Sequence, residues 1–209
     1  MLVMHKLKSM LWLALCGSIW GIIELIGGDF LYHAEIPLSS VWLAVWAFFI
    51  LSLARGINDR WGSSTFVAIV AGLFRSINAS PFFCHMLGIL FLGLAFDLTA
   101  SLFSSKKWRT NLQKSLVGVL SAYGGYALFA FVITYIIQYE YWIGEGLSKV
   151  VNHIFVGGSL AALFASVVVP IGYNVGKRGE VFLATRPQWS HSLGVFLLFL
   201  IWSLKILVG

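Results

Sequence analysis

The chain has 209 residues, of which 59% are hydrophobic and only 11% are charged, whereas an ordinary soluble domain carries about 25% charged residues. This composition excludes a soluble globular domain and indicates a single integral membrane domain over residues 1–209. The formal net charge of +6 does not indicate a nucleic-acid partner, because the Lys and Arg residues lie in short stretches between apolar runs, as in membrane proteins. We therefore expect membrane lipid, and no nucleic acid, around the chain.

Seven apolar stretches approach the length of about 20 residues that a membrane-spanning helix needs. The sequence therefore predicts an all-α polytopic membrane helix bundle of about seven transmembrane helices, with a six-helix core and an additional C-terminal helix. Lys6 and Lys8 before the first stretch imitate a signal peptide, but no small-x-small cleavage pattern follows, so we interpret this stretch as a retained span. In chain order, the predicted spans are residues 9–28, 39–55, 62–77, 82–103, 112–138, 147–173 and 190–208.

The positions of the basic residues predict how the helices are oriented. With the N-terminus inside, only Arg75, Lys149 and Lys205 of the 14 Lys and Arg residues fall on the outer side. Such an excess of positive charge is typical of cytoplasmic loops. We therefore expect a protein of a bacterial or archaeal cytoplasmic membrane with its N-terminus inside.

The first span carries a stripe of small residues with a carboxylate set into it. The members of this stripe alternate between three and four positions apart, which places them on one face of a helix. They are Ala14, Gly17, Gly21, Glu24 and Gly28. A carboxylate within a span costs about 2.5–3.5 kcal/mol on insertion scales, so it normally faces protein or a watered cavity. We expect this face to pack closely against the rest of the bundle.

Three later spans combine a small-residue face with an ionisable side chain. Arg75 ends such a face in the third span, His85 begins one in the fourth, and His153 begins one in the sixth. Small residues at this spacing let membrane helices approach closely, so these faces are expected to point into the bundle. Because odd spans run outward and even spans inward, we predict that Glu24, Arg75, His85 and His153 converge on an outward-facing pocket.

The wall of this pocket is expected to include Asp29 and His33, with Trp20 or Trp46 if these side chains turn inward. Carboxylate and imidazole groups also suit a divalent cation or haem. No two of these histidines share the short spacing of a recognisable metal site, so a metal stays an open question and we predict no cofactor.

A structural interpretation stands beside the pocket hypothesis. Glu24 and Arg75 would form a buried ion pair that fixes helix register, and the two histidines would bind backbone carbonyl groups at helix starts. Asp97, in the inner half of the fourth span, is interpreted as a structural partner of Arg55, Arg60 or Arg109 in preference to a proton relay.

Motifs of common enzymes are missing from the sequence. The run from Gly172 to Lys177, GYNVGK, is one residue shorter than a phosphate-binding loop, lacks the following Ser or Thr, and ends a predicted span. No serine-nucleophile or metalloprotease motif occurs. We therefore predict that the chain is not an enzyme.

The first hundred residues combine several features of one known family. These are the run GSIWGIIE at residues 17–24, the following Gly27-Gly28, Pro37, a loop at Arg55 and a third span that ends at Arg75. This combination resembles the substrate-binding (S) components of energy-coupling factor (ECF) transporters. S components usually have six spans, whereas this chain is expected to add a seventh.

The resemblance implies that the chain captures a vitamin-like or metal-related solute outside and passes it inward with a transmembrane coupling subunit and cytosolic ABC ATPases. It also implies that Ala14, Gly17, Ser18 and Gly21 contact the coupling subunit. The leading hypothesis is thus a solute-binding membrane subunit of an uptake transporter. The alternatives are an accessory or structural subunit of a larger membrane complex, and a metal or haem permease.

Overall fold

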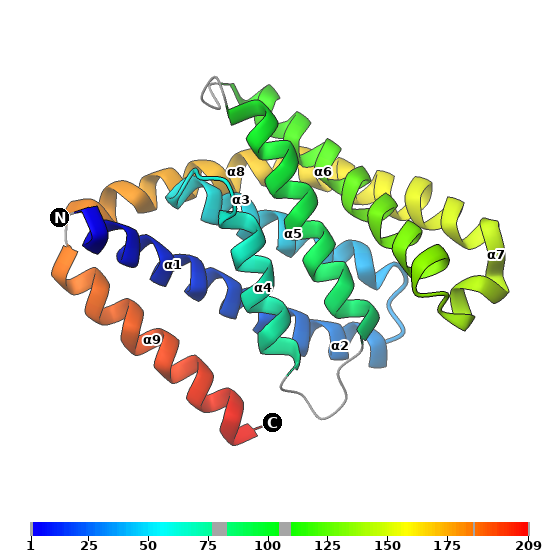
Figure 1. The fold of residues 1–209 in the computed structure, drawn as a ribbon, viewed down its shortest axis with the longest axis horizontal. Helices are drawn as coiled ribbons and strands as arrows, with labels where there is room; N and C mark the ends of the chain where they lie inside the picture. Colours follow the sequence, from blue (N-terminus) through cyan, green and yellow to red (C-terminus); the bar gives the residue numbers. More distant parts are fainter. Residues whose placement is uncertain (1, 77–82, 105–109, 186, 209) are drawn as a thin grey trace.

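The computed structural model describes residues 2–76, 83–104, 110–185 and 187–208, and within these ranges the chain forms helices and short connections with no strand. The helices join into seven rods, some of which contain a short π-helical segment (η) (Figure 1). In chain order, the elements of these rods are α1 (Leu2–Ile22) with η1 (Ile23–Gly27) and α2 (Gly28–His33); α3 (Ser39–Ile57); α4 (Ser63–Ser76); α5 (Phe83–Ser104); α6 (Asn111–Phe131) with η2 (Val132–Ile136); α7 (Glu140–Asn152) with η3 (His153–Gly157) and α8 (Gly158–Thr185); and α9 (Pro187–Val208).

The predicted all-α membrane bundle is confirmed. Five rods are long and apolar enough to cross a membrane, and they match the first, second, fourth, fifth and sixth predicted spans. The third predicted span corresponds to α4, which has 14 residues, and the apolar part found in α9 is limited to His191–Ile206. The described part of α4 is slightly shorter than the predicted span 62–77, whereas α9 as a whole has 22 residues and covers the predicted span 190–208.

Glycines bring the later half of α3 into backbone contact with α8. A Cβ atom on Gly176 would lie 2.2 Å from the Leu53 carbonyl oxygen, and one on Gly56 would lie 2.5 Å from the Tyr173 carbonyl oxygen. A Cβ atom on Gly172 would likewise lie 2.6 Å from a backbone oxygen of α3. The glycines of the GYNVGK run thus serve close helix packing, as small residues do in membrane proteins.

The other predicted small-residue faces also point into the bundle. Gly17 and Gly21 of α1 face α4, where a Cβ atom on either would lie 2.6 Å from an atom of α4. Ala68 of α4 and Ala165 of α8 lie on the faces predicted in the third and sixth spans, and both are buried. A Cβ atom on Gly93 of α5 would lie 2.2 Å from the Ala68 side chain, and one on Gly118 of α6 would lie 2.6 Å from the Ala165 backbone oxygen. The prediction that these faces point into the bundle is therefore confirmed.

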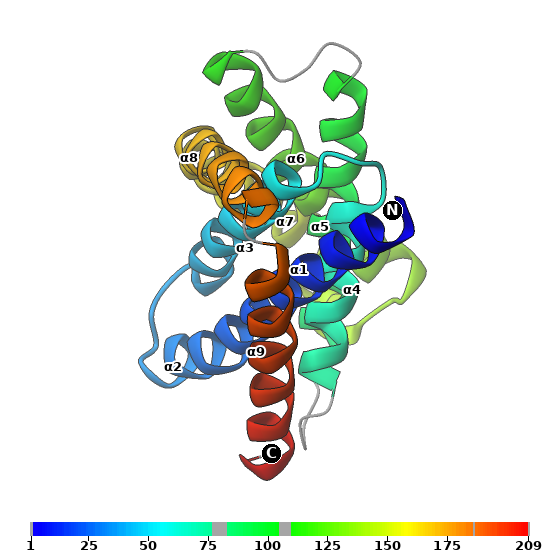
Figure 2. The ribbon, with the colours of Figure 1, turned by 90° about the vertical axis from the view of Figure 1, so that its left-hand side faces the viewer.

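The last helix, α9, lies on the outside of the bundle and contacts chiefly α1 (Figure 2). Trp202 donates a hydrogen bond from Nε1 to the Ser18 hydroxyl over 2.9 Å and packs edge-on against Phe74 of α4. Gly194 lies against Leu11 of α1. The opposite face of α9 carries exposed apolar side chains, which suits a helix that faces lipid.

A buried ion pair joins α3 to α5 near the ends of these helices. Arg55 is 1% exposed and donates to Asp97 over 2.5 Å and to Asp59 over 2.8 Å. The second carboxylate oxygen of Asp97 accepts from the Gly62 amide and the Thr65 hydroxyl. Of the three arginines that the sequence offered as partners of Asp97, Arg55 is the one that pairs with it, and Arg109 lies outside the described residues.

We predict that Gly176→Ala lowers the free energy of unfolding by about 1–3 kcal/mol, because extra volume in a packed interior costs that much. Gly179→Ala, one turn further along α8, is the matched control, since a Cβ atom there lies 4.0 Å from the nearest atom of Ile57. This control is expected to leave stability unchanged or to raise it by up to about 1 kcal/mol. Reversible unfolding in mixed micelles measures both variants, and equal stabilities would contradict the packing.

We also predict that Asp97→Asn destabilises the chain by about 3 kcal/mol, because it leaves the buried Arg55 charge without its closest partner. Glu180→Gln is the control, because it removes an ion pair with Lys177 whose two side chains are 45% and 46% exposed. Exposed pairs contribute about 0.5 kcal/mol. The same unfolding measurement applies, and a loss for Asp97→Asn no greater than that for Glu180→Gln would refute the structural role of the pair.

Candidate functional site

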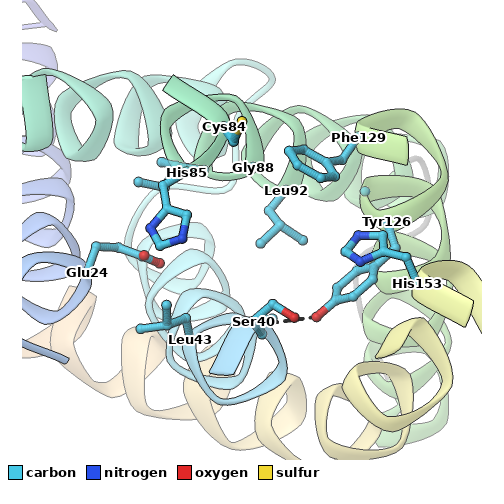
Figure 3. A pocket seen from close by; sticks show the side chains of 13 residues that line it. Glu24, Ser40, Leu43, Cys84, His85, Gly88, Leu92, Tyr126, Phe129 and His153 are labelled. Atoms are coloured by element: carbon cyan, nitrogen blue, oxygen red, sulfur yellow. Dashed lines mark hydrogen bonds between the residues drawn. The ribbon is translucent and has the colours of Figure 1, made fainter. Parts of the chain in front are cut away.

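A cavity of about 110 Å³ lies between the starts of α3 and α5, the later part of α6, and the π-helical segments η1 and η3 (Figure 3). Ser40 and Leu43 of α3, and Cys84 and His85 of α5, line it from the helix ends opposite to those that carry Arg55 and Asp97. The cavity therefore lies at the other end of the bundle from the buried ion pair.

Three of the four residues predicted to converge do line this cavity. Glu24 reaches it from η1, His85 from α5 and His153 from η3. In Figure 3, Glu24 and His85 lie on one side of the cavity, and His153 lies with Tyr126 on the other. The reasoning from helix direction and small-residue faces thus placed these three side chains correctly.

Glu24 is buried, with 5% of its surface exposed. Its Oε1 atom accepts a hydrogen bond of 2.9 Å from Nε1 of Trp20, one turn earlier on the same rod. Trp20 is fully buried, so this side chain does turn inward, although it supports Glu24 and does not line the cavity itself. Among the described residues, the second carboxylate oxygen of Glu24 has no hydrogen-bond donor, and the side chain points towards the cavity (Figure 3).

Arg75 does not line the cavity, which corrects the prediction that it forms part of the pocket. Its Nη1 atom donates to the backbone oxygen of Glu24 over 3.0 Å, and its Nη2 atom lies 3.7 Å from the Asp29 carboxylate. The guanidinium lies behind the Glu24 backbone because α4 packs against α1 through Gly17 and Gly21. The expected ion pair between the two side chains is also not formed, since Arg75 binds the backbone of Glu24 and not its carboxylate.

Asp29 and His33 were expected in the pocket wall, and this prediction is wrong for both. They lie on α2, which continues the first rod past the cavity, and both are exposed, with 54% of the Asp29 side chain accessible. Nδ1 of His33 lies 2.8 Å from the backbone oxygen of Asp29, one turn earlier on the helix. Trp46 is also exposed and lies outside the cavity lining.

Aromatic side chains form the wall around His153. Its ring stacks on Tyr126 at 4.6 Å between centroids and lies 5.4 Å from Phe129 and 5.1 Å from Trp142. The Tyr126 hydroxyl donates to the backbone oxygen of Ser40 over 3.2 Å, so the ring is held between α6 and α3. Trp142 of α7 is buried behind this wall and packs edge-on against Phe129.

Sequence reasoning missed Tyr126 and Phe129, which line the cavity from the fifth predicted span. Their spacing of three residues places both on one face of α6, and Gly125 beside them packs against Leu92 of α5. This aromatic pair next to a close-packing glycine was the available signal. Trp142 was interpreted only as one of the aromatic residues that anchor a helix at the membrane surface.

The π-helical segments occur where the chain meets the cavity. Glu24 lies in η1, His153 begins η3, and η2 follows Phe129 on α6. A π-helical turn contains more residues than an α-helical turn and so rotates the following side chains, and such segments are frequent at functional sites. Arg75 adds a second hydrogen-bond donor to the backbone oxygen of Glu24, which holds the irregular turn in place.

Of the four residues expected to contact a coupling subunit, Gly17, Ser18 and Gly21 are buried within this chain, and Ala14 is partly exposed. Gly17 and Gly21 are covered by α4, and Ser18 accepts from Trp202 of α9 while donating to the backbone oxygen of Ala14. The expected docking face is therefore occupied by helices of the same chain in this structure. The stripe packs closely, as predicted, but against α4 and α9.

Among the described residues, no group of three or more His, Cys, Asp or Glu side chains is placed to hold a metal ion.

Comparisons of the chain with protein-family models, with curated proteins and with solved structures find no match. The resemblance of residues 17–24 and the following features to ECF S components therefore stays a hypothesis, and the argument for a function comes from the cavity.

Proposed function

We propose that this chain is a solute-binding membrane subunit of an uptake transporter and that the cavity captures its small-molecule solute. The observation that carries the proposal is that Glu24, His85 and His153 come from three separate rods and line one cavity. Ionisable side chains are costly within a span, so the meeting of three of them at one cavity favours a polar ligand there.

The cavity itself supports this proposal. Elsewhere the same bundle packs so closely that added methyl groups would overlap backbone atoms, as at Gly93 and Gly118. A cavity lined by polar side chains thus lies within a bundle that is closely packed at these glycines, which is typical of a binding site.

The distribution of basic residues suggests the side from which the solute enters. The cavity lies at the end of α3 and α5 opposite to Arg55, and the exposed Arg60, Lys177 and Arg178 belong to the predicted cytoplasmic side. Under this orientation the cavity faces outward. The resemblance to S components adds the proposal that a separate coupling subunit and cytosolic ATPases drive release inward.

We predict that a small molecule accompanies the chain through purification in lipid nanodiscs and that mass spectrometry detects it. Gly88→Leu should abolish its retention, because Gly88 lines the cavity and a Cβ atom there lies 4.0 Å from the nearest atom of Phe129, so the larger side chain extends into the cavity. Glu24→Gln should lower retention at least about tenfold, because hydrogen bonds to charged groups contribute about 1.5–3 kcal/mol.

Gly144→Leu is the matched control, because a Cβ atom on this α7 glycine has no atom within 4 Å and Gly144 is not part of the cavity lining. It should retain the molecule as the parent chain does. The proposal fails if the parent chain carries no molecule beyond those found with Gly88→Leu, provided that both proteins show the same helical circular dichroism.

A further inference from the structure

Among the described residues that line the cavity, the charged side chains are of one sign only. Among the described residues that line it, Glu24 is the only acid, and neither Lys nor Arg is present. The nearby guanidinium of Arg75 is directed to the Glu24 backbone and to Asp29 and does not reach the cavity. Within the described lining, a ligand in the cavity therefore contacts one carboxylate and no lysine or arginine side chain.

The Glu24 carboxylate is also incompletely bonded. An ionised carboxylate offers about four lone-pair sites. Glu24 is only 5% exposed, and among the described residues it receives one hydrogen bond, from Trp20. Buried charges need a partner of opposite charge and further hydrogen bonds. The free oxygen of Glu24, which is directed towards the cavity (Figure 3), is the position for such a partner.

The opposite side of the cavity is aromatic and apolar. Tyr126 and Phe129 form this side together with His153, while Leu43 and Leu92 cover the space between (Figure 3). Aromatic faces bind both apolar groups and cations. A ligand that satisfies Glu24 at one end is therefore expected to place an apolar or aromatic body against these rings.

The volume limits the size of this ligand. A dry cavity of about 150 Å³ takes benzene, and this cavity of about 110 Å³ is smaller, so it encloses only part of a ligand that carries a six-membered ring. The rest of such a ligand has to extend out of the cavity.

We propose that the cavity binds a small organic ammonium ion, with its amine on the free oxygen of Glu24 and its apolar or aromatic body against Tyr126 and Phe129. The ammonium group supplies up to three donors and a positive charge in direct contact with the carboxylate, whereas the Arg75 guanidinium bonds the Glu24 backbone. His85 lines the cavity on the same side as Glu24 (Figure 3). This inference rests on the proposed function and adds the chemical class of the solute.

The test uses three probes of nearly equal shape, namely benzylamine, benzyl alcohol and benzoate, with the full chain in nanodiscs of zwitterionic phosphatidylcholine. Isothermal titration at pH 7 measures binding, and empty nanodiscs correct for partition into lipid. Benzylamine is expected to bind at least about tenfold more tightly than benzyl alcohol, and benzoate more weakly than either.

Variants connect this preference to Glu24. Glu24→Gln should weaken benzylamine at least about tenfold and benzyl alcohol less than about threefold. Glu24→Asp, which keeps the charge, should weaken benzylamine but still favour it over benzyl alcohol. Gly88→Leu should abolish binding of all three probes, and Gly144→Leu should change none.

Two outcomes overturn the ammonium proposal. The first is that benzyl alcohol or benzoate binds the parent chain as tightly as benzylamine, which does not depend on how any variant folds. The second is that no probe binds in a manner that Gly88→Leu abolishes. In either case the proposed function still stands if a co-purified molecule of another class depends on Gly88, and it fails with the inference if no such molecule is found.

Discussion

A charge inside a membrane bundle needs a partner, and this requirement is met differently at the two ends of the molecule. At one end, the buried guanidinium of Arg55 is bonded to Asp97 and Asp59, and the remaining oxygen of Asp97 accepts from a backbone amide and a hydroxyl. At the other end, Glu24 receives one hydrogen bond from Trp20 and faces a cavity. The first arrangement is complete within the chain, whereas among the described residues no cationic side chain forms an ion pair with the Glu24 carboxylate.

Close helix packing keeps that incomplete arrangement in place. Gly17 and Gly21 bring α1 against α4, so Arg75 reaches the backbone oxygen of Glu24. On the far side, Tyr126 is bonded to the backbone at Ser40, which joins α6 to the start of α3. Both sides of the cavity are therefore fixed by contacts within the chain, as in a preorganised binding site.

Residue spacing in the sequence was sufficient to predict the bundle and the meeting of Glu24, His85 and His153. Helix direction alternates along a membrane chain, and small residues mark the faces that pack, so these two facts together place side chains at one end and on the inside. The direction in which a long side chain points does not follow from residue spacing. Arg75 lies near the cavity but turns to a backbone oxygen, because its orientation depends on the distance between α1 and α4.

The errors for Asp29, Tyr126 and Phe129 likewise arise from local geometry and helix packing that residue spacing does not reveal. Asp29 was expected to follow Glu24 into the pocket, but the first rod continues through η1 into α2 and carries it to the exposed surface. A π-helical segment has no reliable sequence signal, so the change of face that it introduces was not predictable. Tyr126 and Phe129 were missed because aromatic residues are common in membrane helices, and their role depends on which helix packs opposite them.

The small-residue stripe of α1 illustrates the limit of such patterns most clearly. Its spacing correctly indicated a closely packed face, but the same spacing serves contacts within one chain and contacts between chains. Here α4 covers Gly17 and Gly21, and α9 covers Ser18 through Trp202. Because α9 contacts chiefly α1 and presents an apolar outer face, a partner that bound this stripe would have to displace α9. A partner that leaves α9 in place would instead meet the apolar outer surface of α9, so the small residues of α1 do not identify the surface on which a coupling subunit docks.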